Sequence, residues 1–287
     1  MAAEVAFEGI SIWESVVLGI VEGITEYLPI SSTGHLTITE KLLGMPIDDP
    51  AVTAYTAIIQ IGAIAAAIIF FWKDIVTIVT AFVRGVFNAQ ARQDPHWRLA
   101  CAVVVGCVPL GVAGLTLKPL IEGPFRSMWV VAGALIAWSA VMTFAEKAAT
   151  HQRDERDVRL MDGLVIGVVQ IFSLIPGVSR SGATISAGLL RDLDRVTATR
   201  LSFFLGIPAL TAAGAFEGIT ANDEIAATVG WLPTIVGTVV SFVVAYVSIA
   251  WLLRYVSKNS IMVFVWYRIA IGILIIALLS TGVISAT

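Results

Sequence analysis

Two glutamates and a short run of hydroxyl residues stand close together near the start of an otherwise apolar chain. The segment from Gly19 to His35 reads GIVEGITEYLPISSTGH. Glu22 and Glu26 are four residues apart, so on a helix both carboxylates lie on one face. Pro29 has no backbone N–H to donate and is expected to end that helix. Small polar residues then predict the start of a second helix with free N–H groups: Ser31, Ser32, Thr33 and Gly34.

A carboxylate pair that faces such a helix start suits a phosphate held together with a divalent cation. The plainer alternative is an amphipathic helix with two solvated glutamates, followed by a loop. The second half of the chain favours the phosphate site, because it contains a matching polar segment.

That second segment, Ile175 to Thr184, reads IPGVSRSGAT. A charged arginine within an apolar segment costs roughly 2.5–3.5 kcal/mol on insertion scales and is a functional-site candidate by default. The planar fork of Arg180 suits phosphate oxygens. Alternatively, Arg180 forms a salt bridge with Glu22 or Glu26 that only locks two hairpins together. The candidate substrate-binding positions around it are Ser179, Ser181, Gly182 and Thr184.

The composition places these residues in a membrane protein. The 287-residue chain is 57% hydrophobic and 14% charged, whereas soluble domains average roughly 45–50% and 25%. Its mean hydropathy is +0.89 and its net charge is −3. The start, MAAEVAFEGISIWES, has no basic region typical of a cleavable signal peptide. Cys101 and Cys107 are expected to be core residues, and nothing indicates a nucleic-acid partner.

The predicted fold class is an all-α polytopic membrane protein. Six segments approach the roughly 20 apolar residues that a spanning helix needs: 51–72, 99–117, 127–145, 201–219, 231–253 and 260–282. Two further apolar segments, 12–43 and 160–190, each break at a proline with hydroxyl residues and glycine. Broken helices at membrane depth are tolerated where protein or a water-filled cavity covers them. Both segments are therefore predicted to be re-entrant hairpins.

The placement of lysine and arginine supports this topology. With the amino terminus outside and both hairpins re-entrant, most basic residues fall in inside loops, as the positive-inside rule requires. Without the hairpins the alternation fails. The inside set is Lys73, Arg84, Arg92, Arg98, Lys147, Arg153, Arg156, Arg159, Arg191, Arg195, Arg200, Arg254 and Lys258, against Lys41, Lys118 and Arg126 outside.

The two hairpins also echo each other at a separation of 148 residues. The corresponding pairs are Gly19 with Gly167, Glu22 with Gln170, Ser31 with Ser179, and Gly34 with Gly182. Residues 1–147 and 148–287 are thus predicted to be two repeats of one membrane domain. An odd number of spans inverts the second copy, and broken helices that meet near the midplane then form a binding site. Because Gln170 replaces a carboxylate, the two halves are not equivalent.

Other charged residues are weaker candidates. Arg268, in FVWYRIAIG, is expected to snorkel or to pair structurally. His96 and His151 fall in polar loops and are expected to be solvated. His35 closes the serine-rich turn, where a plain hydrogen-bonding role is the alternative to a chemical one.

The two polar segments carry a family resemblance. EGITEYLPISSTGH and PGVSRSGAT resemble the signature motifs of the undecaprenyl-pyrophosphate phosphatase family associated with bacitracin resistance. The similarity extends to KLLGM, IIQIGAI and WYR elsewhere in the chain. It implies hydrolysis of a polyprenyl pyrophosphate to the monophosphate, which recycles the lipid carrier for cell-envelope glycan synthesis.

The resemblance also implies a cofactor and residue roles. The cofactor is a divalent cation, Mg²⁺ or Ca²⁺, with Glu22 and Glu26 as essential carboxylates and metal ligands. A serine–histidine pair falls on Ser32 and His35, and the family's arginine falls on Arg180. The supporting polar positions are Ser31, Thr33, Ser179, Ser181 and Thr184.

Three nucleophiles fit these residues: Ser32 activated by His35 or Glu26, His35 itself, or water activated by a carboxylate. We favour Ser32. The lipid tail is expected between spans, with the pyrophosphate in a pocket open to the outer face of the plasma membrane. The competing function is a flippase or transporter of polyprenyl phosphate or another anionic substrate. A homodimer is compatible with the sequence.

Overall fold

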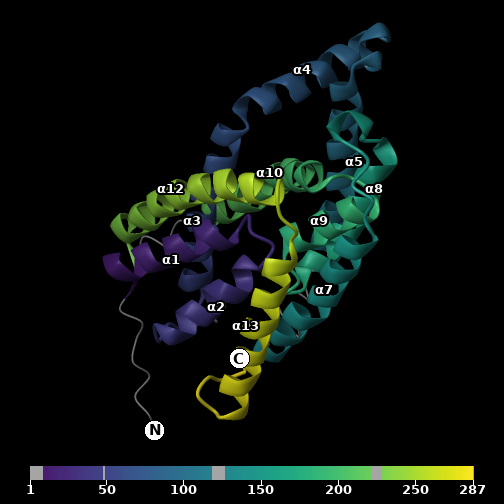
Figure 1. Ribbon diagram of the computed structural model, residues 1–287. Coiled ribbons are helices and arrows are strands. Elements are labelled where there is room, and N and C mark those ends of the chain that lie inside the picture. Colours follow the sequence, from purple (N-terminus) through teal and green to yellow (C-terminus); the bar gives the residue numbers. More distant parts are fainter. Residues whose placement is uncertain (1–8, 48, 118–126, 221–227, 287) are drawn as a thin grey trace.

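The computed structural model describes residues 9–47, 49–117, 127–220 and 228–286 (Figure 1). This part of the chain is helical, and its one β-type pairing is an isolated bridge between Arg153 and Leu193. Six of the described helices are long and apolar enough to cross a membrane, as predicted. They are α3 (Pro50–Phe70), α5 (Pro95–Thr116), α7 (Met128–Ala148), α10 (Arg195–Thr220), α12 (Trp231–Val256) and α13 (Met262–Ser280).

The predicted boundaries hold to within a few residues, except that α10 begins at Arg195 instead of residue 201. Two predicted outside charges, Lys118 and Arg126, lie outside the described residues. So do residues 1–8, on which the signal-peptide expectation partly rests.

The two interrupted segments each form a pair of short helices. The first contains α1 (Ile12–Thr25) and α2 (Ser32–Leu42). The second contains α8 (Leu160–Gln170), the 3-10 turn η4 (Ile171–Leu174) and α9 (Arg180–Leu190). The first helix ends at Thr25, before the predicted Pro29. Pro29 cannot donate an N–H to the Thr25 carbonyl, so the last turn before the proline opens.

Serine caps begin both second helices. Ser31 precedes α2 with φ 78°, and its side chain accepts a hydrogen bond from the Gly34 N–H. Ser179 precedes α9 with φ 75° and accepts from the Gly182 N–H at 3.1 Å. The predicted start of α2 is therefore confirmed, and α9 begins after the corresponding serine 148 residues later. A positive φ is uncommon for serine, and such strain clusters at functional sites.

An additional helix, α4 (Trp72–Phe87), occupies part of the predicted inside loop. Figure 1 shows α4 extending away from the other helices before the chain returns through α5. The turn η1 (Gln90–Gln93) closes this unit, where Arg92 Nε donates to the Gly85 carbonyl at 2.7 Å. The apolar residues of α4 recur every three or four positions, a helical pattern that a count of charges does not reveal.

Glycines let the short helices pack closely against the long ones. A Cβ at Gly19 of α1 would collide with the Gly237 carbonyl of α12. A Cβ at Gly167 of α8 would likewise collide with the Gly106 backbone of α5. Membrane helices associate through such small residues, because close backbone approach maximises packing. Both short helices are thereby fixed against neighbours that are distant in sequence.

A buried carboxylate joins the start of α8 to the end of α9. The Asp162 side chain is 0% exposed and accepts hydrogen bonds from Arg153 at 2.5 Å and Arg191 at 2.8 Å. The turn η3 (Glu155–Asp157) lies in the same loop, and the Asp157 carbonyl accepts from Arg153. Arg153 and Arg191, two basic residues of the predicted inside loops, thus link the start of α8 to the end of α9 through Asp162.

Candidate active site

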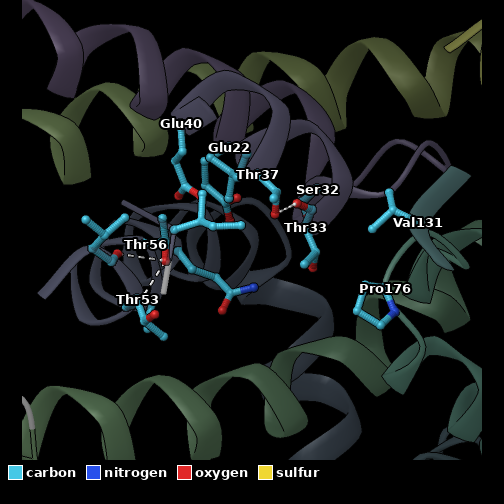
Figure 2. Close-up of a pocket in the computed structure, with 14 residues that line it drawn as sticks. Glu22, Ser32, Thr33, Thr37, Glu40, Thr53, Thr56, Val131 and Pro176 are labelled. Atoms are coloured by element: carbon cyan, nitrogen blue, oxygen red, sulfur yellow. Dashed lines mark hydrogen bonds between the residues drawn. The ribbon is translucent and has the colours of Figure 1, made fainter. Parts of the chain in front are cut away.

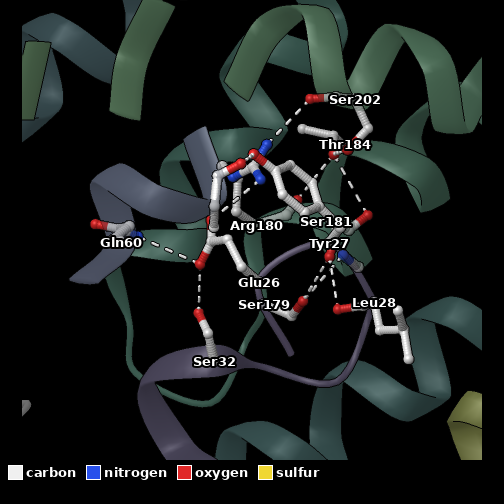
Figure 3. A network of polar contacts seen from close by, with 12 residues as sticks. Glu26, Tyr27, Leu28, Ser32, Gln60, Ser179, Arg180, Ser181, Thr184 and Ser202 are labelled. Carbon is white, nitrogen blue, oxygen red and sulfur yellow. Dashed lines mark hydrogen bonds and ion pairs between the residues drawn. The ribbon is translucent and has the colours of Figure 1, made fainter. Parts of the chain in front are cut away.

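The two polar segments meet at Glu26. Ser32 Oγ donates a 2.7 Å hydrogen bond to Glu26 Oε2, and Arg180 Nη2 pairs with Glu26 Oε1 at 3.2 Å. Gln60 of α3 also donates to Glu26 Oε2, at 3.3 Å. Figure 3 shows these side chains converging from α1, α2, α3 and α9. The Glu26 carboxylate therefore links a hydroxyl, an amide and a guanidinium that come from three other helices.

The surroundings of Arg180 fix its direction. Its Nη1 donates to the Ser202 carbonyl at 3.1 Å, and its guanidinium lies 5.9 Å from the centre of the Tyr27 ring, a cation–π contact. Gly206 of α10 leaves room for the guanidinium, since any Cβ there would collide with it. The ion pair that is the plainer alternative for Arg180 is thus present, with Glu26 as the partner.

Glu22 faces a separate cavity. Its side chain is buried, and its Oε1 atom has no hydrogen-bond partner among the described residues. The cavity has a volume of about 320 Å³ and is lined by Glu22, Ser32, Thr33, Glu40 and Gln60, among others. Figure 2 shows Glu22 and Glu40 entering it from the same side.

A second cavity of about 620 Å³ begins at the polar centre and continues between α5 and α10. Its polar end contains Glu26, Ser32 and Arg180. Its apolar walls include Leu110, Gly111, Leu115, Pro208 and Leu210. A space that is charged at one end and apolar at the other suits an amphiphile with an anionic head.

His35 is not placed beside the Ser32 hydroxyl. Its Nδ1 atom lies 2.7 Å from the Ser31 carbonyl, and its Nε2 atom lies 2.8 Å from the Tyr267 hydroxyl. The His35 and Tyr267 rings stack at 5.5 Å. A carbonyl only accepts, so Nδ1 carries the proton, and in the neutral ring Nε2 accepts from Tyr267. His35 therefore supports the turn at Ser31, and it lines neither cavity.

The other predicted binding residues divide into two groups. Ser31, Thr33 and Ser179 line the larger cavity. The remaining five have internal positions: the Gly34 and Gly182 N–H groups bond the cap serines, Ser181 bonds the Leu28 carbonyl, Thr184 bonds Ser202, and Gln170 is fully buried. These five residues line neither cavity, and their contact with a ligand stays a prediction.

Several site residues were missed by sequence reasoning. Gln60 had a usable signal, because it is a polar amide within an apolar span. Glu40 had a weaker one, as a buried carboxylate five residues beyond the end of the first motif. Ser202 and Gly206 had none, since only their contact with Arg180 distinguishes them.

The oxygen donors fit a hard divalent cation. Glu22 offers a buried carboxylate oxygen without a protein partner, close to the carboxylate of Glu26 along the helix. The described residues contain no group of three or more histidine, cysteine or acidic side chains placed to hold a metal. Mg²⁺ is usually bound in proteins by one or two carboxylates together with substrate phosphates, and a divalent cation, Mg²⁺ or Ca²⁺, stays a prediction for this site.

The six apolar spans define a multi-pass membrane protein. Its larger cavity ends at a site formed by a carboxylate, a hydroxyl and an arginine. The family model "Bacitracin resistance protein BacA" matches residues 15–274, and the chain belongs to this family. Similar curated proteins include Undecaprenyl-diphosphatase 3 of Frankia casuarinae, 54% identical over 96% of this chain and 100% of its own. Undecaprenyl-diphosphatase of Cutibacterium acnes is 52% identical over 95% and 98%. Undecaprenyl-diphosphatase 1 of Streptomyces avermitilis is 53% identical over 96% and 99%.

Proposed function

We infer that this protein hydrolyses undecaprenyl diphosphate to the monophosphate and inorganic phosphate. It thereby recycles the lipid carrier for cell-envelope glycan synthesis and confers bacitracin resistance. The chain is about 50% identical to undecaprenyl-diphosphatases over nearly its full length, and this similarity supports the function. The observation that carries it in the structure is the double contact of Glu26, with Ser32 on one oxygen and Arg180 on the other.

The site favours Ser32 as nucleophile and Glu26 as its base, because a nucleophile and base are recognised by their hydrogen bond. Ser32 Oγ attacks the terminal phosphorus while Glu26 takes its proton. The bond from that phosphorus to the bridging oxygen breaks, and undecaprenyl phosphate leaves. Water then attacks the phosphoseryl phosphorus, Glu26 returns the proton to Ser32 Oγ, and phosphate is released. His35 and a water nucleophile remain the other two routes.

Arg180 binds the transferring phosphoryl group. A phosphate with more negative charge than one carboxylate competes with Glu26 for the guanidinium on Oε1. Glu26 takes the Ser32 proton on its other oxygen, Oε2, which already accepts from Ser32. Positioning and charge neutralisation supply most of the catalysis in phosphoryl transfer. Glu22 and Glu26 would hold the Mg²⁺ or Ca²⁺, which supplies further positive charge to the phosphate oxygens.

The prenyl tail follows the larger cavity between α5 and α10. Its walls are apolar beyond the polar centre, and a Cβ added at Gly111 would meet no heavy atom within 4 Å. The cavity is much shorter than a long prenyl chain, so the remainder of the tail lies against the lipid.

We also propose the topology that the sequence predicted: two re-entrant hairpins, inverted repeats, and a site that opens to the outer face of the plasma membrane. Support comes from the serine caps, which lie 148 residues apart and share a positive φ. It also comes from the paired packing of α1 on α12 and α8 on α5. Homodimerisation stays a prediction.

The function is tested by phosphate release from undecaprenyl diphosphate by the purified protein, with and without EDTA. Glu22→Gln and Arg180→Ala are expected to abolish metal-dependent release. The matched control is Arg254→Gln, which changes an exposed arginine at the end of α12. No release by folded wild-type protein would refute the phosphatase and direct the work to lipid-phosphate transport in vesicles.

A further inference from the structure

Arg268 occupies an unusual position in the last span. It is 0% exposed and the largest of the fully buried side chains. Of the two expectations for Arg268, snorkelling to the surface is therefore wrong, whereas a structural pairing agrees with its hydrogen bonds. Among the described residues no carboxylate pairs with it. A buried charge without a counter-charge is costly, and such residues in membrane spans are functional by default.

The partners of Arg268 are the two turns that precede the serine caps. Nη1 donates to the Pro29 carbonyl at 3.3 Å, and Nη2 donates to the Gly177 carbonyl at 2.9 Å. Pro29 lies two residues before Ser31, and Gly177 lies two residues before Ser179. The two acceptors are thus 148 residues apart, the same separation as the two caps. One guanidinium binds corresponding atoms of both polar segments.

The remaining contacts hold the guanidinium to the neighbouring helix. Nε donates to Ser139 Oγ at 3.3 Å, and Nη2 reaches the Ala134 carbonyl at 3.5 Å, both in α7. Next to it in the chain, Tyr267 bonds His35, which bonds the Ser31 carbonyl. Arg268 therefore contacts both turns directly, and Tyr267 reaches the end of the first turn through His35.

We propose that Arg268 is a positioning residue that sets the distance between Ser32 and Arg180. Each of these two residues is the first of its helix, directly after a cap whose turn Arg268 binds. Each of the two carbonyls accepts from a different nitrogen of the same guanidinium, so neither can rotate without breaking a charge-assisted bond. The strained serine caps stay in place for the same reason. This role rests on the proposed roles of Ser32 and Arg180.

Lysine cannot replace arginine in this role. The lysine ammonium is a point charge, whereas the arginine guanidinium is a rigid fork that donates to the Pro29 and Gly177 carbonyls at once. Arg268→Lys keeps the charge and removes the span between the turns, so it separates positioning from electrostatics.

The test measures geometry and turnover in the same variants. Spin labels at Leu42 and Leu190, exposed residues at the ends of α2 and α9, are introduced after both native cysteines are replaced by alanine. The wild type is expected to give one narrow distance, and Arg268→Gln and Arg268→Lys broader, shifted ones. Turnover should fall about 100-fold with little change in KM, as for a misplacement of about 1 Å. Arg254→Gln should change neither.

A double-variant comparison excludes a general folding defect. In an Arg180→Lys background, Arg268→Gln should cost much less than in the wild type, because the alignment that it protects is already lost. Equal losses in both backgrounds, or unchanged distances, would overturn the proposal. Failure of both Arg268 variants to fold would also overturn it in favour of a structural role. The spin-label distances are measured without substrate, so they test the positioning role of Arg268 even if wild-type protein released no phosphate.

Discussion

Ser32 and Glu26 form a 2.7 Å hydrogen bond across the break between α1 and α2, in which the serine hydroxyl is the donor. Ser32→Ala removes the nucleophile, and Glu26→Gln removes the base. We expect each to lower turnover by at least about 100-fold, the lower range for a general base. Phosphate release measures the loss, and phosphoserine should be trapped only when both residues are present. Near-normal turnover of Ser32→Ala would exclude serine attack.

Gln60 is expected to matter although the motifs do not include it. Its amide donates to the Glu26 oxygen that also receives Ser32. Gln60→Ala should lower turnover about tenfold, in line with loss of one hydrogen bond to a charged group. Gln60→Glu places a like charge beside Glu26 and should be worse. If Gln60→Glu were as active as wild type, the contact would have no part in catalysis.

Gly206 gives a steric test of the Arg180 position. Gly206→Ala puts a methyl group where the guanidinium lies, so Arg180 must leave its contacts with Ser202 and Glu26. Turnover should fall strongly while the protein stays folded. Gly133→Ala is the matched control, because nothing lies within 4 Å of its Cβ position in α7. Equal activity of the two alanine variants would contradict the observed packing of Arg180.

The apolar cavity predicts a dependence on chain length. Gly111→Phe fills the apolar part of the cavity between α5 and α10. We expect a higher KM for undecaprenyl diphosphate and a smaller effect on a short-chain prenyl diphosphate, whose tail ends before the obstruction. Gly133→Phe, on an exposed face of α7, is the control. An equal effect on both substrates would place the tail elsewhere.

Asp162 predicts an acid-sensitive stability. Burial alone would raise its pKa, but hydrogen bonds from Arg153 and Arg191 outweigh burial and hold the pKa below its usual value. A lowered pKa in the folded state means that the carboxylate stabilises the fold above about pH 4 and loses that effect as the pH falls further. Asp162→Asn should cost roughly 3 kcal/mol, as for breaking a buried pair, and should remove this pH dependence.

Thermal unfolding in detergent at neutral and acidic pH measures both effects. Asp192→Asn is the comparison, because it changes a half-buried carboxylate in the same loop region that accepts from Thr150 instead of from an arginine side chain. An Asp162→Asn protein that kept the full acid-dependent loss of stability would assign that loss to other groups.

The sequence was a good guide wherever a pattern is local. Ser31 and Ser179 could be placed at helix starts because cap chemistry depends on residues three positions apart. The spans could be found because hydropathy is a property of continuous segments. The meeting of Glu26 with Arg180 was one of two alternatives open from the sequence, since a buried arginine needs an acceptor.

Contacts between distant segments were beyond such patterns. The Arg268 to Pro29 bond joins residues 239 positions apart, and nothing near Arg268 distinguishes a buried fork from a snorkelling one. The orientation of His35 depends on Tyr267, 232 positions away. The helix α4 is a different case, because its apolar periodicity is local and could have been recognised from the sequence. Its basic residues, Lys73 and Arg84, fit an inside loop equally well, so the charge count did not reveal the helix.

The packing of α1 against α12 also has a consequence for biogenesis. During translation α1 leaves the ribosome long before α12 is synthesised, so this helix, which carries the buried Glu22, enters the translocon without the helix that later packs on Gly19. An uncovered carboxylate is costly in lipid. We therefore expect α1 and α2 to stay near the membrane surface or beside the insertion machinery until α12 has been synthesised and inserted. A chain truncated before α12 would leave α1 permanently without this packing partner, and we expect membrane proteases to degrade such a chain.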